Sequence, residues 1–196
     1  MTAIFSAKAQ RPTFEPSAQL MVYGSQIDGD KYGGYDKGNI AFHIQTERIN
    51  RRLLQWAIGL GYAQRGSVRK ADPDNGVYTQ YKIALGYISV PIKLTLKQKA
   101  KRNKPALYAE SGLELLTLIS STESDEIGTI DNREPFQRFT ADALLNLGLQ
   151  QKNWSVFIGF RYSLLPARIL ENTNLNYDSN LMQFNNVVGV GIKRNF

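Results

Sequence analysis

The sequence has no cysteine and a single histidine, His43. Without cysteine, the chain has no disulfide framework, no thiolate metal site and no cysteine nucleophile. One imidazole alone leaves a multi-histidine metal centre without ligands. We therefore expect no metal centre and no other cofactor.

Long apolar runs are also missing. No segment approaches the roughly 18 to 20 consecutive apolar residues that a membrane-spanning helix requires, which excludes a helical membrane protein. A transmembrane β-strand needs only about 10 residues of alternating polarity. The apolar fraction of 42% therefore does not exclude a membrane barrel.

Residues 1–9 end in Ala7-Lys8-Ala9, which has the small-x-small form of a secretory cleavage site. A basic n-region and most of an apolar h-region are missing before it. We interpret residues 1–9 as the residual tail of an export signal. The alternative is an ordinary disordered N-terminus.

Residues 154–164 carry the clearest strand pattern. Large apolar side chains occupy every second position: Trp154, Val156, Ile158, Phe160, Tyr162 and Leu164. The interleaved positions hold Ser155, Phe157, Gly159, Arg161 and Ser163. Because successive side chains of a strand point to opposite faces, the pattern predicts one apolar face and one mostly small or polar face. A membrane barrel requires this division.

The same alternation recurs in segments 19–23, 40–47, 54–63, 107–115, 140–149 and 188–196. One segment changes phase, because its large residues are odd-numbered over 81–87 and even-numbered over 90–96. We expect a β-bulge near Ile88 and Ser89, close to Pro91, that returns both runs to one face. Two short strands are the alternative.

The connections between these segments alternate in length. Three are short or basic, at 47–52, 97–104 and 151–153, and four are longer, at 28–37, 65–76, 119–135 and 165–180. Short periplasmic turns and long external loops are typical of outer-membrane barrels. Seven connections join eight strands. The sequence therefore predicts an all-β fold over residues 10–196, an eight-stranded antiparallel up-and-down transmembrane β-barrel of the bacterial outer membrane.

The net charge of +7 is unevenly distributed. The four long connections hold seven basic and twelve acidic residues, whereas the three short turns hold nine basic residues and one acidic residue. The basic excess lies in the periplasmic turns and is centred on Lys97, Lys99, Lys101, Arg102 and Lys104. This rim is a candidate contact for anionic lipid headgroups or an acidic protein; the alternative is a solvated turn. Nucleic acid is not an expected partner, because no aromatic residues are interleaved with the basic run.

Strand parity places a second set of charges inside the barrel. The candidates for a lumen charge network are Glu110, Glu114, Asp142, Arg161, Lys93 and Lys193. Parity adds Glu15, Glu47, Lys82 and Arg138 to the same face. Charges in a narrow lumen must be paired or hydrated. Since side chains fill the interior of an eight-stranded barrel, we expect a salt-bridged plug and no open pore.

Aromatic residues mark the ends of the predicted strands. Trp56, Trp154 and Phe196 lie at the periplasmic ends, and Tyr62 and Tyr162 lie near the opposite ends. Rings with a polar edge fit the headgroup layers of a bilayer, so these five residues form a candidate aromatic girdle. Core packing would explain any one of them, but not all five in matching places.

Three stretches carry a resemblance to a known family. They are residues 25–37 (SQIDGDKYGGYDK), 61–67 (GYAQRGS) and 87–93 (YISVPIK). With the glycine-rich final strand that ends in Phe196, they resemble the PorT-like outer-membrane β-barrel family of Bacteroidota over nearly the whole chain. The resemblance implies an outer-membrane barrel and, for one family member, a role in type IX secretion. It implies no catalytic residues.

We expect a non-enzymatic barrel that acts as an accessory or scaffold subunit of an outer-membrane assembly, type IX secretion-like or other envelope machinery. Its partners would be outer-membrane lipid and other outer-membrane or periplasmic proteins. A monomeric barrel that binds unknown client proteins is a closely related hypothesis. The alternative is a lipid-modifying enzyme, which would depend on His43 with Ser155 or Ser163. A soluble lipid-binding barrel is disfavoured, because it would place large apolar residues inside.

Overall fold

The computed structural model describes residues 13–28, 34–49, 54–71, 73–75, 78–98, 104–125, 128–130, 135–169 and 182–196. The predicted export tail at 1–9 lies outside these residues, as do Lys99, Lys101 and Arg102 of the basic turn. Within the described ranges, no helix has the length and apolar character needed to cross a membrane. A short 3-10 turn, η1 (Pro73–Asn75), lies between two strands.

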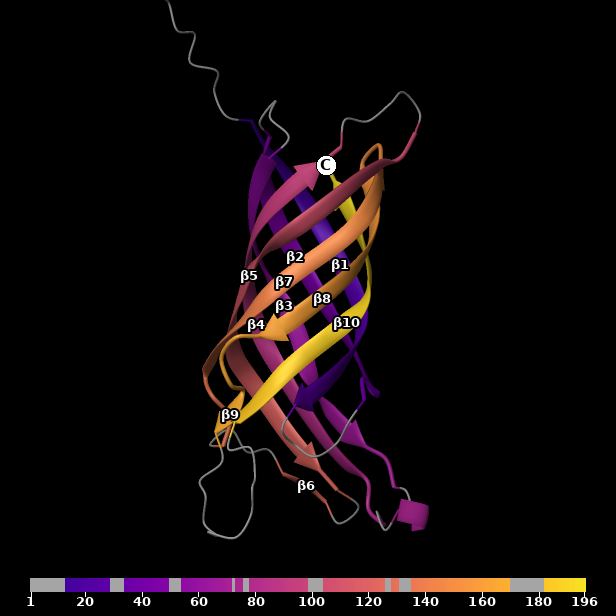
Figure 1. The fold of residues 1–196 in the computed structure, drawn as a ribbon. Coiled ribbons are helices and arrows are strands. Elements are labelled where there is room, and N and C mark those ends of the chain that lie inside the picture. Colours follow the sequence, from indigo (N-terminus) through magenta and orange to yellow (C-terminus); the bar gives the residue numbers. More distant parts are fainter. Residues whose placement is uncertain are drawn as a thin grey trace, which may run out of the picture.

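Over the described residues, eight long antiparallel strands close into one barrel (Figure 1). They are β1 (Thr13–Asp28), β2 (Lys37–Ile49), β3 (Leu54–Arg69), β4 (Tyr81–Lys97), β5 (Ala106–Ser124), β7 (Phe139–Gln151), β8 (Trp154–Ser163) and β10 (Met182–Asn195). Each pairs with the next along the chain, and β1 pairs with β10 to close the sheet. The two-residue strands β6 (Thr129–Ile130) and β9 (Arg168–Ile169) pair with β5 and β10. The predicted eight-stranded barrel is confirmed.

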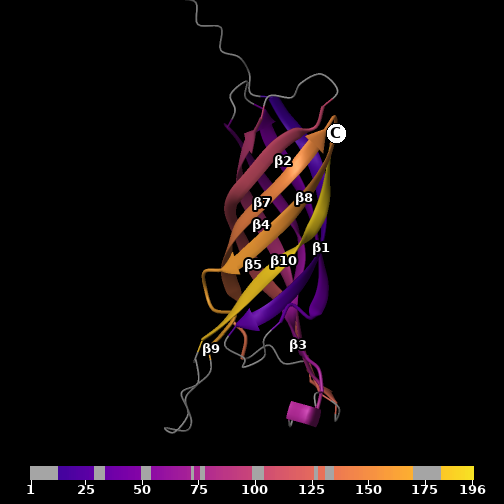
Figure 2. The ribbon, with the colours of Figure 1, turned by 45° about the vertical axis from the view of Figure 1, so that its right-hand side comes forward.

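The two ends of the barrel differ as the connection lengths predict (Figures 1 and 2). At the short-turn end, β1 begins, β10 ends, and β2–β3, β4–β5 and β7–β8 are joined. At the opposite, long-loop end, the chain connects β1–β2, β3–β4, β5–β7 and β8–β10. β3 continues to Arg69 and β5 continues to Ser124, so the first residues of two predicted loops belong to the barrel wall instead.

Side chains alternate between the outer surface and the lumen. Along β8, exposed and buried residues alternate without exception from Trp154 to Ser163. The exposed members are large and apolar; Val156 and Ile158 are 56% and 51% exposed. Equivalent residues are exposed on the other long strands, which gives the barrel an apolar outer belt. Such a belt is stable only in a lipid environment, so the protein is a membrane barrel.

Strand β4 overturns one prediction. Its burial pattern keeps a single phase, with odd-numbered residues inward from Ile83 to Thr95. Its pairing with β3 also keeps one register from Tyr81 to Leu96. The bulge predicted near Ile88 and Ser89 is therefore wrong, and so is the alternative of two short strands. The register shift lies on the β5 side, opposite the step from Gly86 to Tyr87, where pairing passes over Ile119.

The misleading feature of β4 is an apolar cluster inside the lumen. Ile83, Leu85 and Tyr87 are large, but they point inward and are buried. They pack toward the long-loop end with other buried apolar residues, including Ile27, Leu116, Leu118, Val187 and Phe136, which precedes β7. The lumen therefore contains a large apolar cluster toward the long-loop end, beside buried polar residues such as Lys37 and Asn185.

Candidate functional site

A network of buried charged side chains fills the rest of the lumen. Its carboxylates are Glu47, Glu110, Glu114 and Asp142, and its cations are Arg65, Lys93, Arg161 and Lys193. All are inward-facing and at most 5% exposed. Opposite charges are equal in number within this set, as burial requires. The six residues predicted for the lumen are all among them.

The half of the network near the short-turn end is built on Glu110 of β5. Lys193 Nζ donates to Glu110 Oε1 at 2.8 Å and also to the Glu47 carboxylate. Lys93 Nζ donates to Glu110 Oε2 at 3.3 Å and to Gln19 Oε1 at 2.8 Å. Side chains of β1, β2, β4, β5 and β10 are therefore joined around the carboxylates of Glu47 and Glu110.

The half nearer the centre is built on Glu114, which lies four residues after Glu110 on the same face of β5. Arg161 Nε donates to Glu114 Oε2 at 3.0 Å, and Arg65 Nη2 donates to the same oxygen at 3.3 Å. Arg65 Nη2 also donates to Asp142 Oδ2 at 3.2 Å, and Ser163 Oγ donates to Asp142 Oδ1 at 2.8 Å. Arg65 is therefore the cation that joins the two carboxylates.

Asn146 of β7 links the two halves. Its Nδ2 donates to Glu110 Oε2 at 2.8 Å, and Arg161 Nη1 donates to its Oδ1 at 2.8 Å. Both ends of one amide are thus used to connect an acid in one half with a base in the other. Hydrogen-bonded side chains consequently extend across the lumen, which closes it by polar contacts as well as by the apolar cluster.

The wall opens slightly where Arg65 enters the lumen. β2 pairs with β3 from Arg48 to Ala41. Beyond Ala41, toward the long-loop end, the described residues of these two strands are not paired with each other. Side chains satisfy the β3 carbonyls there: the Tyr23 hydroxyl donates to the carbonyl of Gln64, and Lys37 Nζ donates to that of Arg65 at 2.6 Å. Ser25 Oγ donates to the carbonyl of Gly66 at 2.6 Å. We call this stretch the β2–β3 seam.

Glycine makes the seam and the network sterically feasible. Gly66 has a φ of +128°, a region that side-chain-bearing residues rarely adopt. At Gly61, an added Cβ would lie 2.5 Å from His43 Cδ2 and 2.1 Å from the carbonyl oxygen of Phe42. The inward glycine at position 61 therefore provides the space that His43 occupies.

Two inward assignments made from parity, those of Lys82 and Arg138, are wrong, because both residues are exposed. Glu15 keeps the inward phase of Ser17 and Gln19 and is half-buried near the short-turn end. The wrong assignment of Lys82 follows from the phase error on β4. Arg138 lies just before the first residue of β7, so the phase of that strand does not apply to it. Parity did not predict Arg65 as an inward residue, because the loop predicted at 65–76 includes it. A longer β3 would have revealed it, since Arg65 continues the inward phase of Ala57 and Ala63.

The other predicted sites are placed as follows. Trp56, Trp154, Tyr162 and Phe196 are exposed on the outer surface, while Tyr62 is half-buried. Of the basic turn, Lys104 is exposed, whereas Lys97 is half-buried and its Nζ donates to Glu47 Oε2 at 3.1 Å, at the edge of the network.

The geometry at His43 does not resemble a hydrolase triad. His43 Nε2 lies 2.7 Å from Ser89 Oγ and 3.0 Å from Glu114 Oε1, so the hydroxyl and the carboxylate share one ring nitrogen. A triad needs the orienting carboxylate on the other nitrogen. His43, Ser89 and Glu114 are also at most 2% exposed, which denies a substrate access. Among the described residues, no group of three or more potential metal ligands is found.

The closed antiparallel barrel and its apolar belt define a small bacterial outer-membrane β-barrel protein. No protein-family model and no curated protein matches the chain. Among solved structures, it is similar to Neisserial surface protein A (NspA), with 13% identity, a TM-score of 0.50, and coverage of 95% of this chain and 100% of that one. This similarity concerns the fold.

Two further solved structures are similar. Ail, the attachment invasion locus protein of Yersinia pestis, solved in complex with the heparin analogue sucrose octasulfate, has 14% identity and a TM-score of 0.46, covering 93% of this chain and 99% of that one. The N-terminal β-barrel domain of Pseudomonas aeruginosa OprF has 9% identity and a TM-score of 0.42, covering 94% of this chain and 100% of that one.

Proposed function

We propose that the protein is a non-enzymatic barrel that acts as an accessory or scaffold subunit of an outer-membrane assembly. The observation that carries this proposal is the closed lumen. Because the charge network and the apolar cluster fill the interior, neither a solute path nor a substrate site is available among the described residues. The outer surface and the two rims are left to carry the function.

The outer face of the β2–β3 seam is the best candidate for a partner contact. A hollow of about 210 Å³ opens there, lined by Lys37, Asn39, Tyr62, Gln64, Lys82 and Thr122 among others. Polar side chains replace the apolar belt at this level, so the hollow suits a protein surface better than acyl chains. The wall is also tallest here, with 16, 17 and 19 residues in β3, β4 and β5 against 10 in β8.

The resemblance to the PorT-like family supports envelope machinery such as type IX secretion as the setting for this contact. A lipid-modifying enzyme is the alternative, and it is disfavoured by the buried single-nitrogen arrangement at His43. His43→Ala should therefore leave the lipid composition of the outer membrane unchanged. Altered lipid A acylation in that variant would favour the enzyme.

Photocrosslinking in intact membranes tests the scaffold proposal. A photoreactive residue at Gln64, in the polar hollow, should give a discrete crosslinked product with another envelope protein. The matched control is the same residue at Phe139, which is exposed near the same end on β7. Identical products at both positions, or a free barrel after mild solubilisation with no product at Gln64, would reject the proposal.

A further inference from the structure

We propose that the outer face of β7, β8, β10 and β1 binds an anionic glycerophospholipid, with its phosphate at Arg194 and one acyl chain in the groove that continues from it along the barrel wall. The inference is independent of the scaffold proposal. It joins two features of the outer surface that meet at the short-turn end, one apolar and one cationic.

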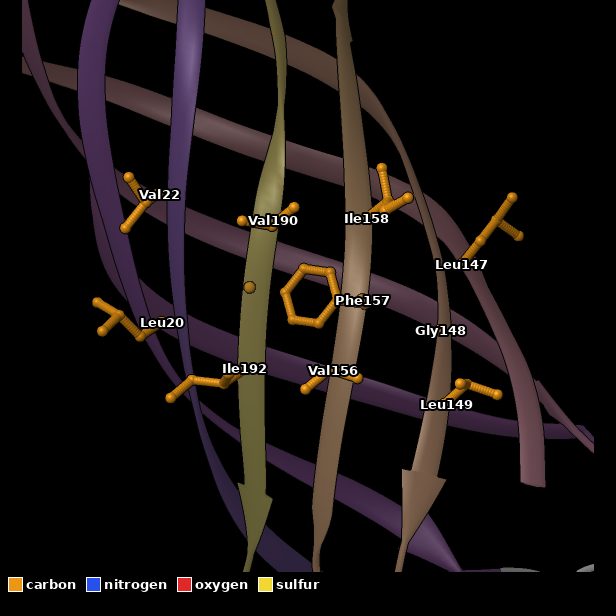
Figure 3. A pocket seen from close by; sticks show the side chains of 11 residues that line it. Leu20, Val22, Leu147, Gly148, Leu149, Val156, Phe157, Ile158, Val190 and Ile192 are labelled. Atoms are coloured by element: carbon orange, nitrogen blue, oxygen red, sulfur yellow. The ribbon is translucent and has the colours of Figure 1, made fainter. Parts of the chain in front are cut away.

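The apolar feature is a groove of about 570 Å³ within the outer belt (Figure 3). Its rims are side chains of four adjacent strands: Leu20 and Val22, Val190 and Ile192, Val156 and Ile158, and Leu147 and Leu149. Gly148, Gly191 and the ring of Phe157 complete the lining. Gly148 and Gly191 face inward and have no side chain, so no side chain at these two positions fills the space between the rims. Every residue that lines the groove is apolar or glycine, which favours an acyl chain over a polar ligand.

Phe157 fixes the shape of this groove. A Cβ added at Gly191 would lie 2.2 Å from Phe157 Cζ, so the glycine is what allows the Phe157 ring to lie beneath β10. Phe157 is 4% exposed and belongs to the buried apolar cluster of the lumen. The groove is a fixed feature of the wall, because its floor is made of strand backbone and a buried ring.

The cationic feature is Arg194, an outward-facing arginine in the final strand. Its guanidinium lies over the ring of Trp154 at 5.2 Å and over the ring of Phe196 at 5.3 Å. Both rings belong to the aromatic girdle, which places the charge at the headgroup level. Arg194 is exposed, and the structure gives it no carboxylate partner among the described residues.

The strand register connects the two features. Arg194 pairs with Trp154, and two residues further into the membrane Ile192 pairs with Val156. Two residues of a strand span roughly 7 Å, so the charge lies at the mouth of the groove. A phosphate at Arg194 would therefore direct an acyl chain between Ile192 and Val156. An arginine at this position breaks the apolar alternation of β10, and a headgroup contact gives a reason for it.

Fluorescence quenching by brominated lipids provides the test, because Trp154 is itself part of the site. The chain has two tryptophans, and Trp56→Phe leaves Trp154 as the reporter. The protein would be reconstituted in bilayers of phosphatidylcholine that contain chain-brominated phosphatidylglycerol. We expect Trp154 to be quenched at low fractions of the anionic lipid, with a selectivity over brominated phosphatidylcholine that decreases as salt increases.

Two pairs of variants separate the charge from the groove. Arg194→Gln should lower the selectivity for phosphatidylglycerol about fivefold, since one basic residue near a membrane surface contributes ~1 kcal/mol. Arg48→Gln, an outward arginine at the same end of β2 between Phe14 and Trp56, should leave the selectivity unchanged. Val190→Phe, which fills the groove, should weaken quenching by both brominated lipids, and Ile44→Phe on β2 should not.

Heat-modifiability on gels would establish that each variant is folded. Equal selectivity in Arg194→Gln and the parent protein would overturn the headgroup contact. Unchanged quenching in Val190→Phe would overturn the acyl-chain groove. If a second copy covers this face instead, Trp154 would be shielded from both lipids and crosslinking in the bilayer would give dimers, which would also overturn the proposal.

Discussion

Replacing Arg65 by leucine should destabilise the barrel more than replacing the neighbouring lumen cation Arg161. Arg65 is the cation shared by Glu114 and Asp142, at 3.3 and 3.2 Å. In Arg65→Leu, Glu114 keeps Arg161 and His43, but Asp142 keeps only the Ser163 hydroxyl among its described partners. Leaving a buried carboxylate without its cation costs about 3–5 kcal/mol. With a urea slope of about 2 kcal/mol per molar, the unfolding midpoint should fall by roughly 2 M.

Arg161→Leu provides an internal comparison of the same chemistry. Glu114 then retains Arg65 and His43, and Asn146 retains its bond to Glu110. The loss is that of hydrogen bonds to a charged group, about 2 kcal/mol, so the effect should be smaller than in Arg65→Leu. Arg138→Leu should have almost no effect on stability, because it removes only the contact of an exposed guanidinium with the ring of Phe139.

Urea titration of the refolded protein, read by heat-modifiability on gels, measures this order. The double variant Arg65→Leu/Asp142→Leu should be more stable than Arg65→Leu alone, because removing both partners of a buried pair avoids an unpaired charge. A midpoint for Arg65→Leu equal to that of the wild-type protein would refute the reasoning. So would a double variant that is less stable than Arg65→Leu, since the cost would then not arise from the stranded Asp142 carboxylate.

Three further outcomes are expected. A single cysteine at Ser124 should be labelled on intact cells, whereas one at Lys104 should be labelled only after permeabilisation, because the two positions lie at opposite ends of the barrel. The reverse result would invert the topology. Purified protein in planar bilayers should give no steady single-channel steps, since the lumen is filled, and reproducible steps would contradict this. Gly61→Leu should lower the urea midpoint or prevent folding, because an added Cβ would lie 2.5 Å from His43 Cδ2, and normal stability would contradict the tight packing.

The sequence predicts the architecture because barrel strands alternate with a period of two. That period is visible in single segments such as 154–164, and the alternating connection lengths count the strands independently. The six lumen charges of the candidate network also follow from parity, since a residue's face depends only on the phase of its own strand. Which acid meets which base depends on the stagger between strands. The bridge made by Asn146 between Glu110 and Arg161 was therefore not visible in the sequence.

The errors on β4 and at Arg65 come from two assumptions about the barrel. The β4 prediction assumed that the lumen is polar along its whole length, and the loop predicted at 65–76 assumed that the wall ends where apolar alternation ends. Instead, Ile83, Leu85 and Tyr87 fill the lumen near the long-loop end, and β3 continues past the lipid-facing belt with Arg65 pointing inward. A strand that leaves the membrane no longer needs an apolar outer face. Hydropathy alone therefore underestimates its length.

The charge network and the apolar cluster should respond differently to substitution. In the charge network, a lost side chain such as that of Arg65 leaves a buried polar group without its partner. The apolar cluster, which includes Leu85, Tyr87 and Leu118, still fills the interior with packed side chains. A variant of the charge network can therefore lose stability while the lumen stays closed to ions. Closure and stability are separate consequences of the packing, which is why conductance and urea titration must both be measured.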